Sequence, residues 1–186
     1  MPDKKNENYG LVNRDDCLVV VIDVQEKLMP VISDKDEVIA NTVKLVEFSK
    51  ICGIPLVVTE QQKLGPTVAQ VKDLLKETRV IEKVHFNCFF NEQFKEQVER
   101  SRRKTLIISG VEAHICVTQT ALYSLKDYRV HIVGDAVSSR SSRNKDLALG
   151  RMRDAGAIIS STEMFIYEML VKAGTEEFKT VLPLVK

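Results

Sequence analysis

The chain has 186 residues, of which 44% are apolar, and this is enough for one domain with a substantial core. Its formal net charge of +1 excludes the excess of clustered Lys and Arg that a nucleic-acid-binding surface needs, so no nucleic-acid partner is expected. No apolar run approaches the roughly 20 residues that cross a bilayer, so no membrane association is expected either.

The N-terminal segment and the cysteines indicate the cellular compartment. Residues 1–14 are expected to form a polar N-terminal extension, and residues 1–8 lack the apolar stretch of a secretory signal. The four cysteines are scattered without a CxxC pair, which favours reduced thiols inside a cell over a disulfide framework. We expect a cytoplasmic protein, with the nucleus and the mitochondrion left open. No linker or internal repeat is evident, so residues 1–186 are expected to form a single domain.

Apolar runs alternate with amphipathic stretches along the chain. The first run, residues 17–22, is continuous and rich in β-branched residues, which is typical of a strand buried on both faces. A helical stripe follows over residues 34–51, and Gly53 is expected to end it. Further strands are expected at 54–59, 79–82, 105–109, 129–133 and 157–160. Further helices are expected at 68–75, 91–101, 116–125, 143–155 and 162–173, with one more short helix after residue 175.

Six alternating β–α units of this kind predict one particular fold class. It is a three-layer, doubly wound α/β sandwich in which a six-stranded parallel sheet carries helices on both faces. In such sheets, ligands bind beyond the carboxyl ends of the strands, where the strand order reverses. The residues that follow the first four strands are therefore the first candidates for a functional site.

Three chemically capable side chains follow strands of this sheet. Asp23 follows the first strand, Lys83 the third and Cys116 the fourth. Asp23 would act as a general base for the thiol, and Lys83 would stabilise both the carboxylate and the thiolate. Because Cys116 is expected at a helix N-terminus, the helix dipole is expected to lower its pKa.

Each of these residues also has a structural alternative. Asp23 would cap the next helix, Lys83 would be a solvated side chain, and Cys116 would be an inert core residue. The functional hypothesis gains its weight from all three residues reaching the same edge of the sheet. Cys88 is the second thiol candidate, but it lacks a helix N-terminus of its own.

Other polar and aromatic residues near the strand ends are candidates for the substrate pocket: Gln25, Glu60, His85, Phe86 and His114. Hydrogen-bonded histidines and core packing of the aromatic ring are the structural alternatives. The three histidines of the chain lack the i, i+4 spacing of a metal site, and no glycine pattern for phosphate binding occurs. We therefore expect no metal and no cofactor.

Four segments carry a resemblance to a known family: Val21-Ile22-Asp23-Val24-Gln25, Ile81-Glu82-Lys83, Gly110-Val111-Glu112-Ala113-His114-Ile115-Cys116-Val117 and Val133-Gly134-Asp135-Ala136. In order and spacing they resemble the isochorismatase-like cysteine hydrolases, over most of the chain from Cys17 to Leu170. The segment Val58-Thr59-Glu60-Gln61 and the C-terminal tail look most similar to the isochorismatase domain-containing subgroup.

The resemblance implies a strand order of 3-2-1-4-5-6 and a catalytic triad of Asp23, Lys83 and Cys116. It also implies a non-proline cis peptide between Val111 and Glu112, with an oxyanion hole formed by the backbone N–H groups of Glu112 and Cys116. The implied reaction is metal-independent hydrolysis of a small amide or related C–N bond through a thioester acyl-enzyme. Members of the family commonly form homo-oligomers, so the expected partners are a small-molecule substrate and further copies of the chain.

Two departures from the family pattern narrow the implied chemistry. Nicotinamidases of the family bind a metal after the second strand, but residues 59–65 contain no histidine here, which argues against the metal and against nicotinamide. True isochorismatases cleave a vinyl ether and lack the cysteine, so Cys116 argues against that reaction.

Two other readings stay open from the sequence. The first is a non-catalytic oligomeric interaction protein, with an apolar C-terminal helix that would be either a subunit contact or core: Phe165, Ile166, Met169 and Leu170. The second is a redox-sensing thiol protein, in which Cys88 would resolve an oxidised Cys116.

Overall fold

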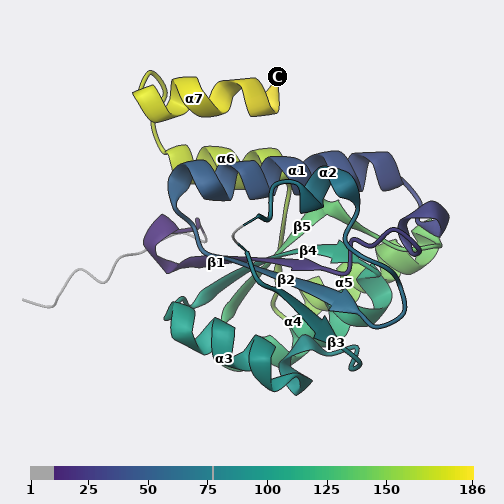
Figure 1. Cartoon of the computed structure of the whole chain (residues 1–186). Helices are drawn as coiled ribbons and strands as arrows, with labels where there is room; N and C mark the ends of the chain where they lie inside the picture. Colours follow the sequence, from purple (N-terminus) through teal and green to yellow (C-terminus); the bar gives the residue numbers. More distant parts are fainter. Residues whose placement is uncertain (1–10, 77) are drawn as a thin grey trace, which may run out of the picture.

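The computed structural model describes residues 11–76 and 78–186, and it contains six parallel strands in one sheet (Figure 1). The strands are β1 (Cys17–Ile22), β2 (Leu56–Gln61), β3 (Val80–Lys83), β4 (Thr105–Val111), β5 (Arg129–Ser138) and β6 (Ile158–Ser160). Their order is β3-β2-β1-β4-β5-β6, so the predicted order is confirmed. Because β1 lies between β2 and β4, the carboxyl ends of β1 and β4 lie at the switch point of the sheet.

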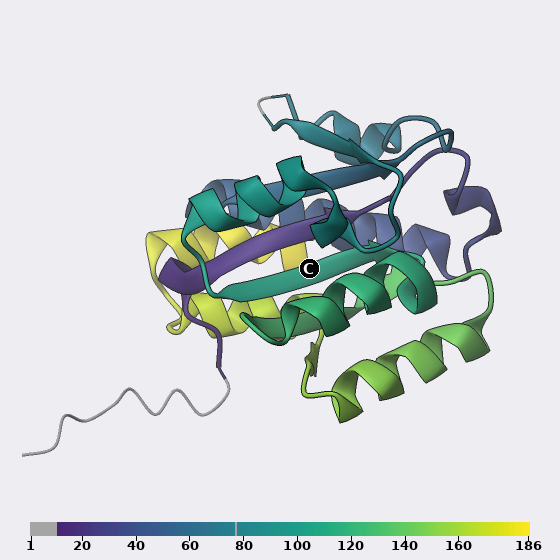
Figure 2. The same ribbon diagram turned by 90° about the horizontal axis from the view of Figure 1, so that it is seen from below.

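Helices cover both faces of the sheet (Figures 1 and 2). One face carries α1 (Lys35–Cys52), α2 (Ala69–Lys72), α6 (Thr162–Leu170) and α7 (Glu176–Val185), and α7 packs over α1 and α6. The opposite face carries α3 (Glu92–Ser101), α4 (Thr118–Ser124) and α5 (Ser142–Asp154). The predicted three-layer α/β sandwich is therefore the observed fold. In the described ranges, no helix combines the length and the apolarity that crossing a membrane would need.

The central strand is inaccessible to solvent because helices pack on both of its faces. Alternate side chains of β1 enter two separate apolar cores: Val19 and Val21 pack in the layer of α1 and α6, whereas Val20 and Ile22 pack in the layer of α3 to α5. Each such buried side chain contributes about 1.5–3 kcal/mol to folding. This burial anchors the end of β1, and the residue that follows it is Asp23.

Some element bounds differ from those predicted. β5 continues through Gly134 to Ser138, and an ideal Cβ at Gly134 would lie 3.3 Å from the carbonyl oxygen of Ser160. This glycine therefore permits a close approach to β6, and the strand is five residues longer than the predicted range of 129–133. The helix expected to begin at Cys116 begins at Thr118, after a π-helical turn over Ala113–Val117. α6 ends at Leu170, and its N-cap is Ser161, whose side chain accepts from the N–H of Met164.

The apolar face of α6 belongs to the core of this chain. Phe165, Ile166, Met169 and Leu170 are each at most 7% exposed, and Phe165 packs edge-to-face on Phe48 of α1 with ring centroids 5.7 Å apart. These side chains are therefore unavailable for a contact with another subunit. The hypothesis that these side chains form a contact between subunits, which the sequence left open, is therefore wrong.

The two ends of the described chain contact each other. Of the predicted extension over 1–14, residues 1–10 lie outside the described residues. The N–H of Val12 donates to Glu168 of α6 at 3.1 Å, and Arg14 forms an ion pair with Glu177 of α7 at 2.6 Å. Residues 12 and 14 therefore pack on the C-terminal helices.

Gly110 occupies a close crossing of β4 and β1. Its φ is +112°, and a Cβ at this position would lie 2.0 Å from the carbonyl oxygen of Ile22. We expect Gly110→Ala to lower the free energy of unfolding by at least about 3 kcal/mol, because the backbone of β1 would have to move. Gly150→Ala in α5 is the matched control, since a Cβ there meets nothing within 4 Å and alanine should stabilise the helix by about 1 kcal/mol. Denaturant unfolding measures both values. An unchanged stability of the Gly110 variant would contradict the close approach of Gly110 to the backbone of β1.

His131 is expected to make the stability of the fold depend on pH. It is 2% exposed on β5, its Nε2 has no hydrogen-bond partner within the described part of the chain, and burial with the charge of Arg129 lowers its pKa to about 4. An unfolded histidine binds a proton below about pH 6.5, but the folded chain does not bind it until about pH 4. Stability is therefore lost as the pH falls through this window, by up to about 3 kcal/mol.

Urea unfolding at a series of pH values between 7 and 4 tests the role of His131. His131→Leu should remove most of this pH-dependent loss, because leucine does not titrate. An equal loss in the variant and in the native chain would show that other groups cause it.

Candidate active site

Asp23 is placed directly after β1 by a left-handed backbone with a φ of 55°. Its side chain is 1% exposed, and the hydroxyl of Thr59 on β2 donates to its Oδ1 at 2.8 Å. Lys83 donates to its Oδ2 at 2.6 Å. Both carboxylate oxygens are therefore satisfied by groups from neighbouring strands, and the burial of the charge is compensated.

Lys83, the last residue of β3, joins the other members of the site. Its Nζ lies 2.6 Å from Asp23 Oδ2, 2.8 Å from Gln61 Oε1 and 3.6 Å from Cys116 Sγ. Burial alone would lower the pKa of Lys83, but the negative charge of Asp23 and smaller effects of the nearby thiols raise it. The side chain is therefore an ammonium, and its three N–H groups match three acceptors.

Cys116 lies in the π-helical turn between β4 and α4. It is 6% exposed, and the turn is closed by the carbonyl oxygen of Glu112, which accepts from the N–H groups of Ile115 and Val117 at 3.0 and 3.3 Å. The hydroxyl of Thr118 donates to the carbonyl oxygen of Ala113 at 2.6 Å. The thiol is thus held by a short, hydrogen-bonded turn next to the ammonium of Lys83.

The protonation state of Cys116 differs from the one expected from a helix N-terminus. Burial, and then the negative charge of Asp23, raise the pKa of the thiol, and Lys83 opposes this only in part. The expected lowering of the pKa is therefore wrong, because burial and the adjacent carboxylate favour the protonated thiol more than Lys83 favours the thiolate. At neutral pH, the resting site therefore contains the protonated thiol of Cys116 close to the carboxylate of Asp23.

The backbone that leads to Cys116 contains a cis peptide bond. The peptide bond between Val111 and Glu112 is cis. The N–H of Glu112 has no acceptor in the ranges 11–76 and 78–186. The Glu112 side chain is 5% exposed, and its carboxylate accepts from the N–H and the Nε of Arg140 at 2.9 and 3.1 Å.

The other pocket candidates are held in different ways. Gln25 is buried, and its amide bonds to the backbone of Gln61 and Gly65. Glu60 accepts from the N–H and the hydroxyl of Thr67 at 2.6 and 2.7 Å. Both side chains therefore shape the loop after β2, and both line a cavity of about 410 Å³ beside that loop.

The aromatic candidate and the two histidine candidates are exposed or partly exposed. His85 and Phe86 are exposed, and the ring of His85 meets the edge of Phe90 with centroids 6.1 Å apart. His114 is partly exposed, and its Nδ1 lies 2.9 Å from the hydroxyl of Ser139. Cys88 is fully buried, and burial raises the pKa of its thiol to about 11.

Two residues of the site were not predicted from the sequence. Gln61 accepts from Lys83, and Thr59 donates to Asp23. The parallel register pairs Gln61 with Lys83 and Thr59 with Ile22, which places the two side chains beside Lys83 and Asp23. These two residues could have been predicted from the register of the strands, but the register can be assigned only once the strand order is known.

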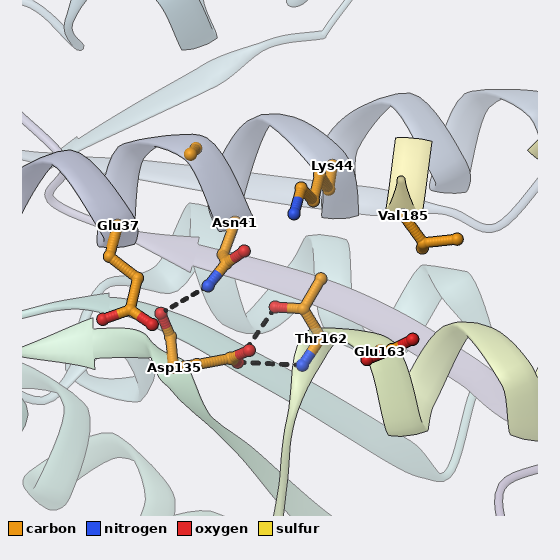
Figure 3. Close-up of a pocket in the computed structure, with 8 residues that line it drawn as sticks. Glu37, Asn41, Lys44, Asp135, Thr162, Glu163 and Val185 are labelled. Atoms are coloured by element: carbon orange, nitrogen blue, oxygen red, sulfur yellow. Dashed lines mark hydrogen bonds between the residues drawn. The ribbon is translucent and has the colours of Figure 1, made fainter. Parts of the chain in front are cut away.

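A second cavity lies away from these residues, between α1 and the start of α6 (Figure 3). Its volume is about 310 Å³. Asp135 of β5 accepts there from the N–H and the hydroxyl of Thr162 at 2.8 and 3.0 Å, and Asn41 donates to its backbone carbonyl. Asp135 therefore connects α1 and α6 to β5.

Within the described residues, no group of three or more His, Cys, Asp or Glu side chains is arranged to hold a metal ion.

Comparisons with known proteins agree with this fold. The model of the isochorismatase domain matches residues 17–164. The secreted isochorismatase effector Isc1 of Phytophthora sojae is 36% identical over 176 residues, which cover 91% of this chain and 84% of that protein. The chain therefore belongs to the isochorismatase family, and it has the hydrolase fold of that family.

Two solved structures are especially similar. The MAR1 ribonuclease from Caenorhabditis elegans is 32% identical, with a TM-score of 0.88, and the match covers 95% of this chain and 92% of that one. YcaC from Pseudomonas aeruginosa, solved with hexane-2,5-diol and covalent acrylamide, is 26% identical, with the same TM-score and the same coverage.

Proposed function

We propose that this chain is a metal-independent cysteine hydrolase that cleaves a small amide or related C–N bond through a thioester. The observation that carries the proposal is the contact of one buried ammonium, Lys83, with both Asp23 and Cys116. Buried charges are costly unless they are paired, so the three groups form one electrostatic unit. A thiol, a carboxylate and an ammonium at the switch point of a parallel sheet are suited to acyl transfer.

The proposed reaction begins with proton transfer from the Cys116 thiol to the Asp23 carboxylate. Because the pKa of the thiol is raised, this transfer accompanies the attack of sulfur on the substrate carbonyl carbon. The C=O electrons move to oxygen, and the oxyanion accepts from the backbone N–H groups of Glu112 and Cys116. Lys83 keeps its charge throughout and balances the charge that moves between Asp23 and sulfur.

The tetrahedral intermediate then breaks its C–N bond. The leaving amine takes the proton from Asp23, and the acyl group stays on the sulfur of Cys116 as a thioester. Water attacks the thioester, Asp23 accepts a proton from this water, and the regenerated thiolate recovers that proton. The products are one carboxylic acid and one amine, and the enzyme returns to its starting state.

The comparisons support a nucleophilic site. The P. aeruginosa YcaC structure is described with covalent acrylamide, and acrylamide is an electrophile that bonds to nucleophilic side chains. The C. elegans neighbour is described as a ribonuclease, so RNA is the substrate against which the proposal must be compared.

A panel of small amides and one structured RNA tests the proposal. We expect release of amine from at least one amide, with the same rate after treatment with a metal chelator, and no cleavage of the RNA. Cleavage of RNA, or loss of amide turnover after chelation, would contradict the proposal. Failure to turn over any amide, with a protein partner recovered instead, would favour a non-catalytic interaction role.

We also propose that the chain forms homo-oligomers. Large apolar side chains are exposed in the segment that follows β3, at fractions of 53–56%: Val84, Phe86 and Phe90. Exposed apolar clusters of this kind often mark contacts between subunits. Native mass spectrometry at micromolar concentration is expected to give a defined oligomer, and a purely monomeric spectrum would contradict this.

A further inference from the structure

Arg140 follows the carboxyl end of β5 and lies against the turn that holds Cys116. Its backbone N–H and its Nε both donate to the buried carboxylate of Glu112, at 2.9 and 3.1 Å. The preceding residue, Ser139, contacts His114 through its hydroxyl, at 2.9 Å from Nδ1. Residues 139–140 therefore contact both Glu112, whose N–H belongs to the proposed oxyanion hole, and the turn over residues 113–117.

The guanidinium of Arg140 is fixed on one side and open on the other. Its side chain is 59% exposed, and its two terminal amino groups make no hydrogen bond to any described residue. Arg14 shows the contrast: both of its terminal amino groups donate to the carboxylate of Glu177, at 2.8 and 2.6 Å. Glu177 thus occupies both terminal amino groups of Arg14. Glu112 binds only the Nε and the backbone N–H of Arg140, so the two terminal amino groups of Arg140 (its fork) stay free to bind another group.

An anchored guanidinium with a free fork matches the geometry of a carboxylate, which it can bind through two parallel hydrogen bonds. The buried Glu112 fixes the direction of the fork, so less side-chain entropy is lost on binding. The first turn of α5, which begins two residues later, contains no acidic side chain that would compete for the fork.

We propose that Arg140 binds a carboxylate group of the substrate, so that the substrate class is a small amide that also carries a carboxylate. This inference rests on the proposed function, because it places the carboxylate relative to an acyl group on Cys116. Arg140 is a specificity-determining residue in this account, and Glu112 is the residue that positions it.

Alkylation of Cys116 by matched acid and amide reagents tests the inference without a known substrate. The reagents are iodoacetate against iodoacetamide, and 3-iodopropionate against 3-iodopropionamide, so that two lengths reach from sulfur toward Arg140. Peptide mass spectrometry gives the rate at Cys116 alone. The acid-to-amide ratio of rates cancels any change in the reactivity of the thiol.

We expect the acid-to-amide ratio of rates to fall about fivefold in Arg140→Gln for at least one of the two reagent lengths. This is the effect expected from the loss of a partly exposed bidentate ion pair. Arg140→Lys should keep part of the preference, and it also serves if the glutamine variant fails to fold. Arg100→Gln is the matched control, since Arg100 is exposed on α3 and its removal changes the net charge equally. Its ratio should equal that of the native chain.

The possible failures are distinguishable. An unchanged ratio in the Arg140 variants, or an equal fall in Arg100→Gln, would overturn the carboxylate site while leaving the proposed hydrolase intact. If no reagent modified Cys116 in the native chain, the proposed nucleophile itself would be contradicted, and the inference would fail with it.

Discussion

Cys116→Ala is expected to lower amide turnover by at least about 10⁴-fold, because no other thiol can reach the substrate once the nucleophile is removed. Cys88 does not replace it, since Cys88 is fully buried and its pKa is raised to about 11. The fold should survive, because the sulfur fills little volume and the turn is held by backbone bonds to Glu112. Steady-state kinetics and a thermal unfolding curve measure the two effects.

Cys52→Ala is the matched control for this prediction. Cys52 is a half-buried residue at the end of α1, remote in the fold from the three grouped side chains, and its removal should leave kcat and KM unchanged. Retained turnover in Cys116→Ala would place the chemistry on another residue. Equal losses in both variants would indicate general damage to the protein.

Asp23→Asn is the second change with a large expected effect. The amide keeps the shape of the carboxylate but cannot accept the proton of Cys116, so turnover should fall by at least about 10³-fold. The variant also leaves the ammonium of Lys83 buried beside a neutral group. Because an uncompensated buried charge costs about 3–5 kcal/mol, the free energy of unfolding should fall by a similar amount.

The double variant Asp23→Asn, Lys83→Met separates catalysis from stability. Removing both charges should restore most of the stability lost in Asp23→Asn, since no buried charge is then left without a partner. Turnover should stay low, because the base is still absent. Denaturant unfolding and steady-state kinetics on the native chain, Asp23→Asn and the double variant measure the two effects separately. Recovery of turnover in the double variant would exclude Asp23 as the base.

The fold followed from the sequence because its signals are local. The continuous β-branched run of β1 and the glycine after α1 each indicate an element without knowledge of the rest of the chain. Parallel strands bring their carboxyl ends to one edge, and this is why Asp23, Lys83 and Cys116 were expected together. The structure does bring these three side chains into contact.

The parts that sequence reasoning missed depend on packing between elements. The role of Gln61 follows only from its register with Lys83. The direction of the pKa shift of Cys116 depends on burial and on the nearness of Asp23, which a helix-terminus argument does not contain. Arg140 lies outside the four segments that carry the family resemblance, and its contact with Glu112 requires the pairing of Val111 with Ser138 across β4 and β5.

Intact-mass measurement of the protein during turnover of an amide substrate is the most direct test of the central claim that Cys116 carries the acyl group. We predict a transient mass increase equal to the acyl group, mapped to the peptide that contains Cys116 and released by hydroxylamine, as a thioester requires. The increase should be absent in Cys116→Ala. Turnover at the native rate in rapid-quench samples with no acyl group on Cys116, or with the group on another residue, would contradict the account.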